Sequence, residues 1–172
     1  MRGPKALAVA ALTVFVMAGS TAAEPAGLSH VRGLNPASRK LIAEALERSA
    51  IIRGLVDALE GTDVVVYVRL DLFEHQTKSG YLSFLATAGG SRYVVVKIDC
   101  LAFTNQRIAT LGHELQHALE VASAPQVRDV RTFAAFYSEV GWGTAAGKYE
   151  TDLARQTGRR VELELAGFRS VM

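Results

Sequence analysis

The string HELQH carries two histidines and a glutamate in a pattern that suits metal-dependent hydrolysis: His113, Glu114 and His117. In a helix the two imidazoles project from one face about one turn apart, where both can bind a single ion. Glu114 points about 100° further round, where it can reach a water on that ion without being a ligand. The spacing therefore predicts a zinc site at which the metal lowers the pKa of a water, and Glu114 accepts its proton and passes it to the leaving group.

Neither chance nor core packing accounts for this pattern. A chain with four histidines and eleven glutamates among 172 residues contains such a string by coincidence about 0.006 times. On a helical wheel the apolar residues lie roughly 140° to 240° from His113, whereas His117 lies near 40° and Glu114 near 100°. The apolar positions are Ile108, Leu111, Leu115, Ala118 and Leu119. The remaining alternative is a pair of solvated histidines on an exposed helix face.

A third protein ligand is needed, because catalytic zinc is usually bound by three side chains and keeps a fourth position for water. The form HExxHxxGxxH is excluded, since Glu120 stands where its glycine would be and Ser123 where its last histidine would be. A downstream carboxylate is the natural replacement. The candidates are Glu139, Glu150, Asp152, Glu162 and Glu164.

Glu150 is the preferred third ligand, with Glu139 second. In the expected last helix, positions 150, 154, 158, 161 and 165 share one face and read Glu, Ala, Gly, Val, Leu. A carboxylate at the head of an apolar stripe points inward and needs a partner, which a metal supplies. A place in the first helical turn also favours its negative charge, and a simple helix-terminal charge is the alternative. Glu139 lies opposite the apolar stripe of its own helix and is expected to face water.

The fold that holds these residues is predicted to be α+β, with a small mixed or antiparallel sheet of about three strands. Asn35 and Ser49 are candidate N-caps of two helices, with Pro36 in the first turn. Runs of β-branched and aromatic residues then predict three strands, the last two joined by Gly89-Gly90. Helices, including the HELQH helix, follow. The expected strands are 63–73, 81–88 and 91–101, and the expected later helices are 105–121, 127–140 and 149–166.

Residues 1–23 predict a secretory signal peptide, because two positive charges precede an uncharged apolar run that ends in small residues. The strongly apolar part is shorter than the roughly 18–20 residues of a membrane-spanning helix. We therefore expect cleavage, export to the periplasm or the extracellular space, and no stable membrane insertion afterwards. Residues 24–34 are expected to be a flexible tether, and residues 35–172 a single domain.

Composition excludes several classes of protein. Loss of Arg2 and Lys5 with the signal peptide leaves equal numbers of basic and acidic residues, which is not the charge of a nucleic-acid binder. Cys100 is the only cysteine, so intrachain disulfides and cysteine-based zinc ribbons are excluded. The oligomeric state is left open.

His113 to His117 followed by Glu150 resembles the zincin metallopeptidases, and within them the gluzincin pattern of two histidines and a distant glutamate. The string YVVVKID before LGHELQHALE, with YETDLA after it, looks like small exported bacterial members of that group. The resemblance implies an edge strand that precedes the metal helix and binds the substrate backbone by strand addition, which suits residues 91–101. The chain departs from the ExxxD form of the glutamate helix, since Ala154 stands where the aspartate would be. The resemblance therefore offers no acceptor, here called the outer partner, for the second ring N–H of a ligating histidine.

The sequence thus predicts an exported zinc metallopeptidase with a zincin-like domain over residues 35–172. His113, His117 and Glu150 are the expected metal ligands, Glu114 is the expected general base and acid, and the substrate is a peptide or protein. Tyr137 and Tyr149 are weighed as oxyanion donors, but neither is assigned. Two alternatives stay open: a non-enzymatic zinc domain that binds a partner, and an exported helical adaptor without metal.

Overall fold

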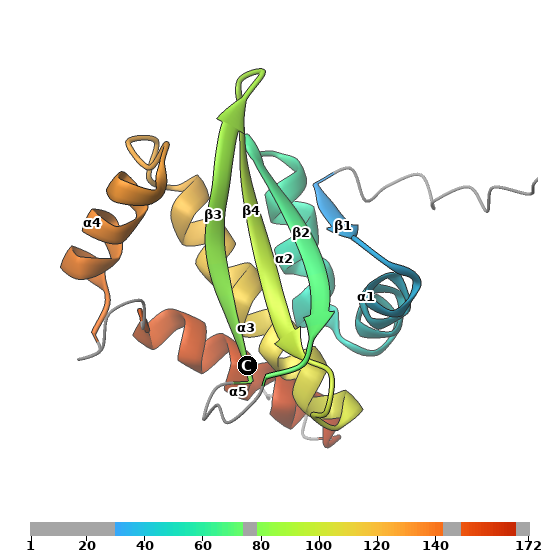
Figure 1. Ribbon diagram of the computed structural model, residues 1–172. Coiled ribbons are helices and arrows are strands. Elements are labelled where there is room, and N and C mark those ends of the chain that lie inside the picture. Colours follow the sequence, from blue (N-terminus) through green and yellow to red (C-terminus); the bar gives the residue numbers. More distant parts are fainter. Residues whose placement is uncertain (1–29, 74–78, 143–148, 168–172) are drawn as a thin grey trace, which may run out of the picture.

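The structure, a computed structural model, describes residues 30–73, 79–142 and 149–167. The predicted signal peptide and residues 24–29 of the predicted tether lie outside these ranges. The described residues form an α+β fold with five helices and one open, mixed four-stranded sheet (Figure 1). In chain order the elements are β1 (Val31–Gly33), α1 (Pro36–Arg48), α2 (Ala50–Glu60), β2 (Val64–Asp71), β3 (Gly80–Ala88), β4 (Ser91–Asp99), α3 (Thr104–Ala122), α4 (Val130–Val140) and α5 (Asp152–Leu165).

The first two helices begin where their caps predict. The Asn35 side chain accepts a hydrogen bond from the amide of Ser38 at 2.9 Å, and the Ser49 hydroxyl accepts one from the amide of Ile52 at 3.1 Å. Each bond satisfies an amide that has no partner within its own helix. Among the described helices, none combines the length and the apolar character needed to span a membrane.

The sheet has the strand order β1-β2-β4-β3, in which β1, β2 and β4 run parallel and β3 is antiparallel to β4. The three predicted strands are present. The fourth, β1, comes from residues expected to be part of the tether, so that expectation is wrong for Val31–Gly33. These residues pair in register with Val66–Val68 of β2. Three residues are too few for a periodic pattern, and pairing with a neighbouring strand orders them.

The hairpin of β3 and β4 turns at Gly89 and Gly90, whose φ angles of 57° and 85° suit a tight two-residue turn. The hairpin leaves β3 at one edge of the described sheet and places β4 between β2 and β3. The expectation that residues 91–101 form the edge strand is therefore wrong. The antiparallel strand that precedes β4 in the chain occupies the edge instead.

One face of the sheet is covered by helices, with α2 and α3 behind it in Figure 1 and α5 crossing beneath α3. The strand residues that point to this face are fully buried, whereas most of those on the other face of β2 and β4 are partly exposed, Val65 and Val95 excepted. They pack with the apolar stripe of α3 to form the core. The strand residues are Val64, Val66, Val68, Val94, Val96 and Ile98, and the helix residues are Ile108, Leu111, Leu115 and Ala118.

A buried arginine attaches the carboxyl end of α3 to the sheet. Arg92 of β4 is 1% exposed, and its guanidinium donates to the carbonyls of Val121 and Ala124 at 2.6 and 2.8 Å. Its Nε also donates to Asp63 at 2.9 Å, and this hydrogen bond lowers the pKa of the Asp63 carboxyl. The arginine thus adds charged donors to carbonyls at the end of α3, which already accept backbone hydrogen bonds, and ties this end of the helix to the strands.

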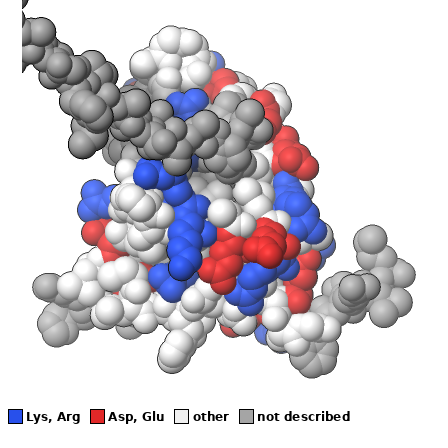
Figure 2. Space-filling view, turned by 90° about the vertical axis from the view of Figure 1, so that its right-hand side faces the viewer, with Lys and Arg blue, Asp and Glu red and all other residues white. Residues whose placement is uncertain are grey.

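Charged groups on the outer surface are mixed in sign. On the side of the molecule shown in Figure 2, lysine and arginine side chains are interspersed with aspartate and glutamate, and no broad single-sign surface is visible.

Candidate metal site

Helix α3 presents the HELQH residues away from its core stripe. His113 keeps 22% of its side chain exposed, whereas His117 is 5% exposed. His117 is buried against the ring of Tyr137, a residue of the hydrophobic core, at 5.3 Å between centroids. Gly112, the one weak helix former in this stretch, lies where α3 packs closely, because an added Cβ would stand 2.8 Å from Val161 of α5.

The structure brings His113, His117 and Glu150 together, as the sequence predicts. Oε1 of Glu150 lies 3.4 Å from Nε2 of His113 and 3.9 Å from Nε2 of His117. One potential ligand atom from each residue lies within 4.8 Å of the others, and no other such group of three occurs in the described part of the chain. The ligands of tetrahedral zinc, bonded at about 2.0–2.1 Å, lie about 3.3 Å apart. Small side-chain movements would therefore bring the three atoms onto one ion.

Glu150 reaches the histidines from an extended residue rather than from the first turn of a helix. Helix α5 begins at Asp152 with Thr151 as its N-cap, so the expected start at residue 149 is wrong. Glu150 instead forms an isolated antiparallel bridge with Trp142, with backbone N···O distances of 2.8 and 3.2 Å. The apolar stripe after it does face α3, and Gly158 permits close contact, since an added Cβ would stand 3.2 Å from His113.

The other carboxylates considered as third ligands lie elsewhere. Glu139 is exposed on α4, as expected, and is not part of the triad. Asp152 pairs with Arg155 at the surface, at 3.0 Å. Glu164 accepts a hydrogen bond from the amide of Ala50 at 2.7 Å, at the start of α2. Glu162 lines the same cavity as the triad but is not one of its members.

Sequence reasoning missed Glu120, which supplies the outer partner expected to be lost with Ala154. Its Oε2 accepts a hydrogen bond from Nδ1 of His117 at 2.8 Å, and its Oε1 accepts one from the hydroxyl of Thr151 at 2.6 Å. Tyr137 donates to the carbonyl of His117 at 3.0 Å, so its hydroxyl is engaged behind the histidine. The available signal was the spacing of three residues from His117, which places both side chains on one helix face.

This hydrogen bond leaves Nε2 of His117 as the nitrogen that faces the site. Burial opposes ionisation of Glu120, but the hydrogen bonds from His117 and Thr151 outweigh it and lower the pKa of the carboxyl. An ionised Glu120 can only accept, so Nδ1 of His117 carries the proton. Nε2 is then buried with no hydrogen-bond partner. A histidine binds a metal through a nitrogen lone pair, and Nε2 of His117 has such a lone pair with no hydrogen-bond donor near it among the described residues. His113, His117 and Glu150 therefore fit a divalent cation.

The electrostatics of the site agree with that fit. Burial, aided by the neighbouring His117, lowers the pKa of His113 to about 4, so its imidazole is neutral near pH 7. Burial also disfavours a charged His117, but the hydrogen bond with Glu120 and the charges of Glu114, Glu120 and Glu150 outweigh it and raise its pKa. Burial raises the pKa of the Glu150 carboxyl. The three carboxylates around His117 favour a positive charge at its imidazole, and a bound cation would supply such a charge.

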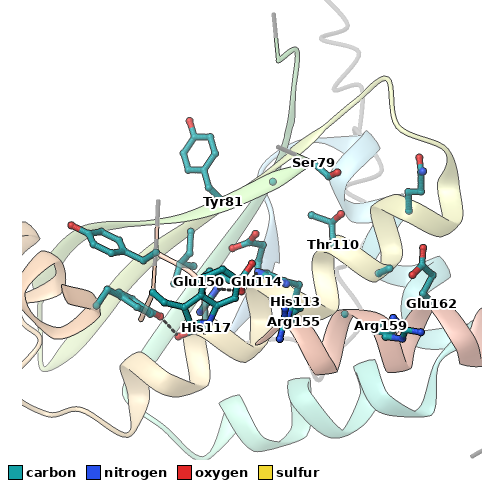
Figure 3. Close-up of a pocket in the computed structure, with 18 of the residues that line it drawn as sticks. Ser79, Tyr81, Thr110, His113, Glu114, His117, Glu150, Arg155, Arg159 and Glu162 are labelled. Atoms are coloured by element: carbon teal, nitrogen blue, oxygen red, sulfur yellow. Dashed lines mark hydrogen bonds and ion pairs between the residues drawn. The ribbon is translucent and has the colours of Figure 1, made fainter. Parts of the chain in front are cut away.

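The triad and Glu114 line an open cavity of about 770 Å³ (Figure 3). Glu114 is 4% exposed and lies against the start of β3. An added Cβ on Gly80 would stand 2.5 Å from Cγ2 of Thr110 and 2.9 Å from the carbonyl of Lys97, and at an ordinary contact distance of 3.5 Å from Oε1 of Glu114. Glycine at this position therefore allows the edge strand to approach α3 closely at Thr110, next to Glu114.

Aromatic side chains form one end of the cavity. Tyr149 stacks on Tyr137 at 5.5 Å between ring centroids, and Trp142 and Phe133 complete this wall. Of the two tyrosines considered as oxyanion donors, Tyr137 donates its hydroxyl to the carbonyl of His117, whereas Tyr149 does not.

Comparison of the chain with protein-family models, with curated proteins and with solved structures finds no significant match.

Proposed function

We propose that this protein is an exported zinc-dependent metallopeptidase with a zincin-like, gluzincin-type site. His113, His117 and Glu150 are the proposed zinc ligands, and Glu114 is the proposed general base. The observation that carries the proposal is the convergence of these three side chains, from two separate segments, in an open cavity beside a buried carboxylate. Neither structural packing nor surface charge requires such a convergence.

The residues divide the reaction between them. Bound zinc supplies Lewis acidity, which polarises a scissile carbonyl and makes water more acidic. Glu114 accepts a proton from the attacking water at its carboxylate and delivers it to the departing amine. The burial of Glu114 beside Gly80 keeps this carboxylate in one position, which matters because proton transfer requires hydrogen-bond distance. Tyr149, in the aromatic wall, is a candidate for an oxyanion donor.

A peptide substrate is supported by the strand beside the site. β3 lies at the edge of the described sheet, and its first residues, Gly80 to Leu82, line the cavity with the triad. An extended peptide can add to such an edge through backbone hydrogen bonds, and its backbone would then run past the residues that would hold the zinc. We therefore propose that β3, and not residues 91–101, is the edge strand that binds the substrate backbone.

The proposal is tested on the full chain, purified without chelator. We expect about one zinc per molecule by elemental analysis and cleavage of members of a mixed peptide library, read by mass spectrometry. A chelator is expected to abolish cleavage, and added zinc to restore it. Absence of stoichiometric metal, or cleavage that survives metal removal, would contradict the proposal.

Glu120 is expected to set the zinc affinity through His117. Glu120→Gln removes the charged acceptor of Nδ1 and should weaken zinc binding about 10- to 100-fold, measured by competition with a chromophoric chelator. Glu44→Gln is the matched control, because Glu44 also pairs with a side chain of its own helix, Arg48 at 2.8 Å, but lies on α1, away from the triad. Equal zinc affinity of the Glu120 variant and the wild type would show that this hydrogen bond does not tune the ligand.

A further inference from the structure

The wall of the cavity formed by α5 is cationic. Arg155 and Arg159 lie one turn apart on this helix, and both line the cavity. In Figure 3 they lie on the α5 side of His113, with Ser79 and Tyr81 across the cavity from them. Glu162, one turn further along, is the acidic residue of the same helix face. Of the charged α5 residues that line the cavity, two are therefore basic and one is acidic.

The two arginines differ in what they already contact. Arg155 pairs with Asp152 at 3.0 Å, and its guanidinium lies 5.2 Å from the ring centre of Trp142. The Arg159 side chain makes no ion pair or hydrogen bond with any described residue, and Glu162, one turn away, is not its partner either. Arg159 is therefore a planar set of donors at a cavity wall, available to a ligand.

We infer that Arg159 selects peptides that carry a carboxylate a few residues from the scissile bond, with Arg155 as the secondary contact. This inference rests on the proposed peptidase function for its reaction. A guanidinium binds a carboxylate with two parallel hydrogen bonds, a geometry that a neutral amide does not match. The carboxylate comes from an acidic side chain or from the free carboxyl terminus of the peptide. Both sources share one chemistry, and the peptide sets below distinguish them.

Binding can be measured apart from catalysis, because Trp142 is the only tryptophan of the chain and lines the cavity. Its emission is recorded during peptide titrations of the full-length Glu114→Gln protein, with and without one equivalent of zinc. The first peptide set consists of acetylated and amidated alanine-leucine hexapeptides with one glutamate at each position in turn. A second set carries glutamine instead, and a third carries glutamine and a free carboxyl terminus.

We expect the best glutamate peptide, or the free-carboxyl peptide, to bind about five- to tenfold more tightly than its neutral counterpart at low salt. Arg159→Met should remove this preference and leave the affinity for the neutral peptides unchanged. Arg160→Met is the matched control, since Arg160 is exposed on the same helix but does not line the cavity. It should retain the preference. Arg155 is left intact in the test, because its contact with Trp142 would alter the emission itself.

Three outcomes would overturn the inference. They are equal binding of acidic and neutral peptides, a preference that survives Arg159→Met, and a preference lost equally in the Arg159 and Arg160 variants. The second would mean that the carboxylate binds elsewhere, as on the zinc, and the third that only long-range attraction acts. A preference that depends on Arg159 in a protein with no peptidase activity would support the inference and count against the proposed function alone.

Discussion

Glu114→Gln is expected to lower kcat for peptide cleavage by about 10²- to 10⁴-fold, the usual contribution of a positioned general base. Glutamine has nearly the same shape as glutamate but cannot accept a proton from water at neutral pH. Glu114 is not one of the three proposed ligands, so zinc content should stay near the wild-type level. The measurement is steady-state cleavage of a peptide identified in the library screen, together with elemental analysis of the same sample.

Glu47→Gln is the control for this loss, because Glu47 is an exposed glutamate of α1 remote from the cavity. It should retain full activity. A Glu114 variant with unchanged kcat and full zinc would remove the residue from the chemistry. A non-enzymatic zinc domain that binds a partner predicts that neither variant changes any measured property.

Glu150→Gln is expected to weaken zinc binding by more than about 100-fold, since even an outer partner of a ligand is worth about 10- to 100-fold in metal affinity. Zinc binds carboxylate oxygen far better than a neutral amide, and the variant leaves two histidines as the only protein ligands. Competition with a chelator gives the affinity, and thermal unfolding with and without zinc gives an independent measure through ligand-linked stability.

Glu139→Gln provides the matched comparison, because Glu139 is the other carboxylate that the sequence offered for the same role. It lies exposed on α4 and should leave the zinc affinity unchanged. The reverse result, with loss in the Glu139 variant and none in the Glu150 variant, would reject the proposed ligand set. Loss in both variants would point to the overall negative charge of the site and not to a specific ligand.

Much of the fold is encoded in short stretches of sequence. The caps at Asn35 and Ser49, the β-branched run of β2 and the Gly89-Gly90 turn each act within a few residues, and the elements form where these signals predict. The placement of His113 and His117 on one side of α3, away from the Leu111 stripe, follows from helical periodicity alone.

Other features depend on contacts between distant segments and could not be predicted from local patterns. β1 is ordered by pairing with β2, more than thirty residues later. The strand order leaves β3 at the described edge because β4 pairs on both sides, which no period within 91–101 reveals. The spacing of Glu120 from His117 was visible, but its second contact, with Thr151, appears only once α5 packs on α3.

Glu150 shows how the two kinds of information combine. The sequence alone identified it as an acidic residue ahead of an apolar stripe, and that stripe does pack against α3. Its own backbone, however, is extended and bridges to Trp142, and this long-range pairing carries the carboxylate to the histidines. Residue types and helical faces thus follow from local chemistry. The meeting of His113, His117 and Glu150 is decided by the tertiary structure, because the entropy of bringing distant segments together is offset only by packing that involves the whole chain.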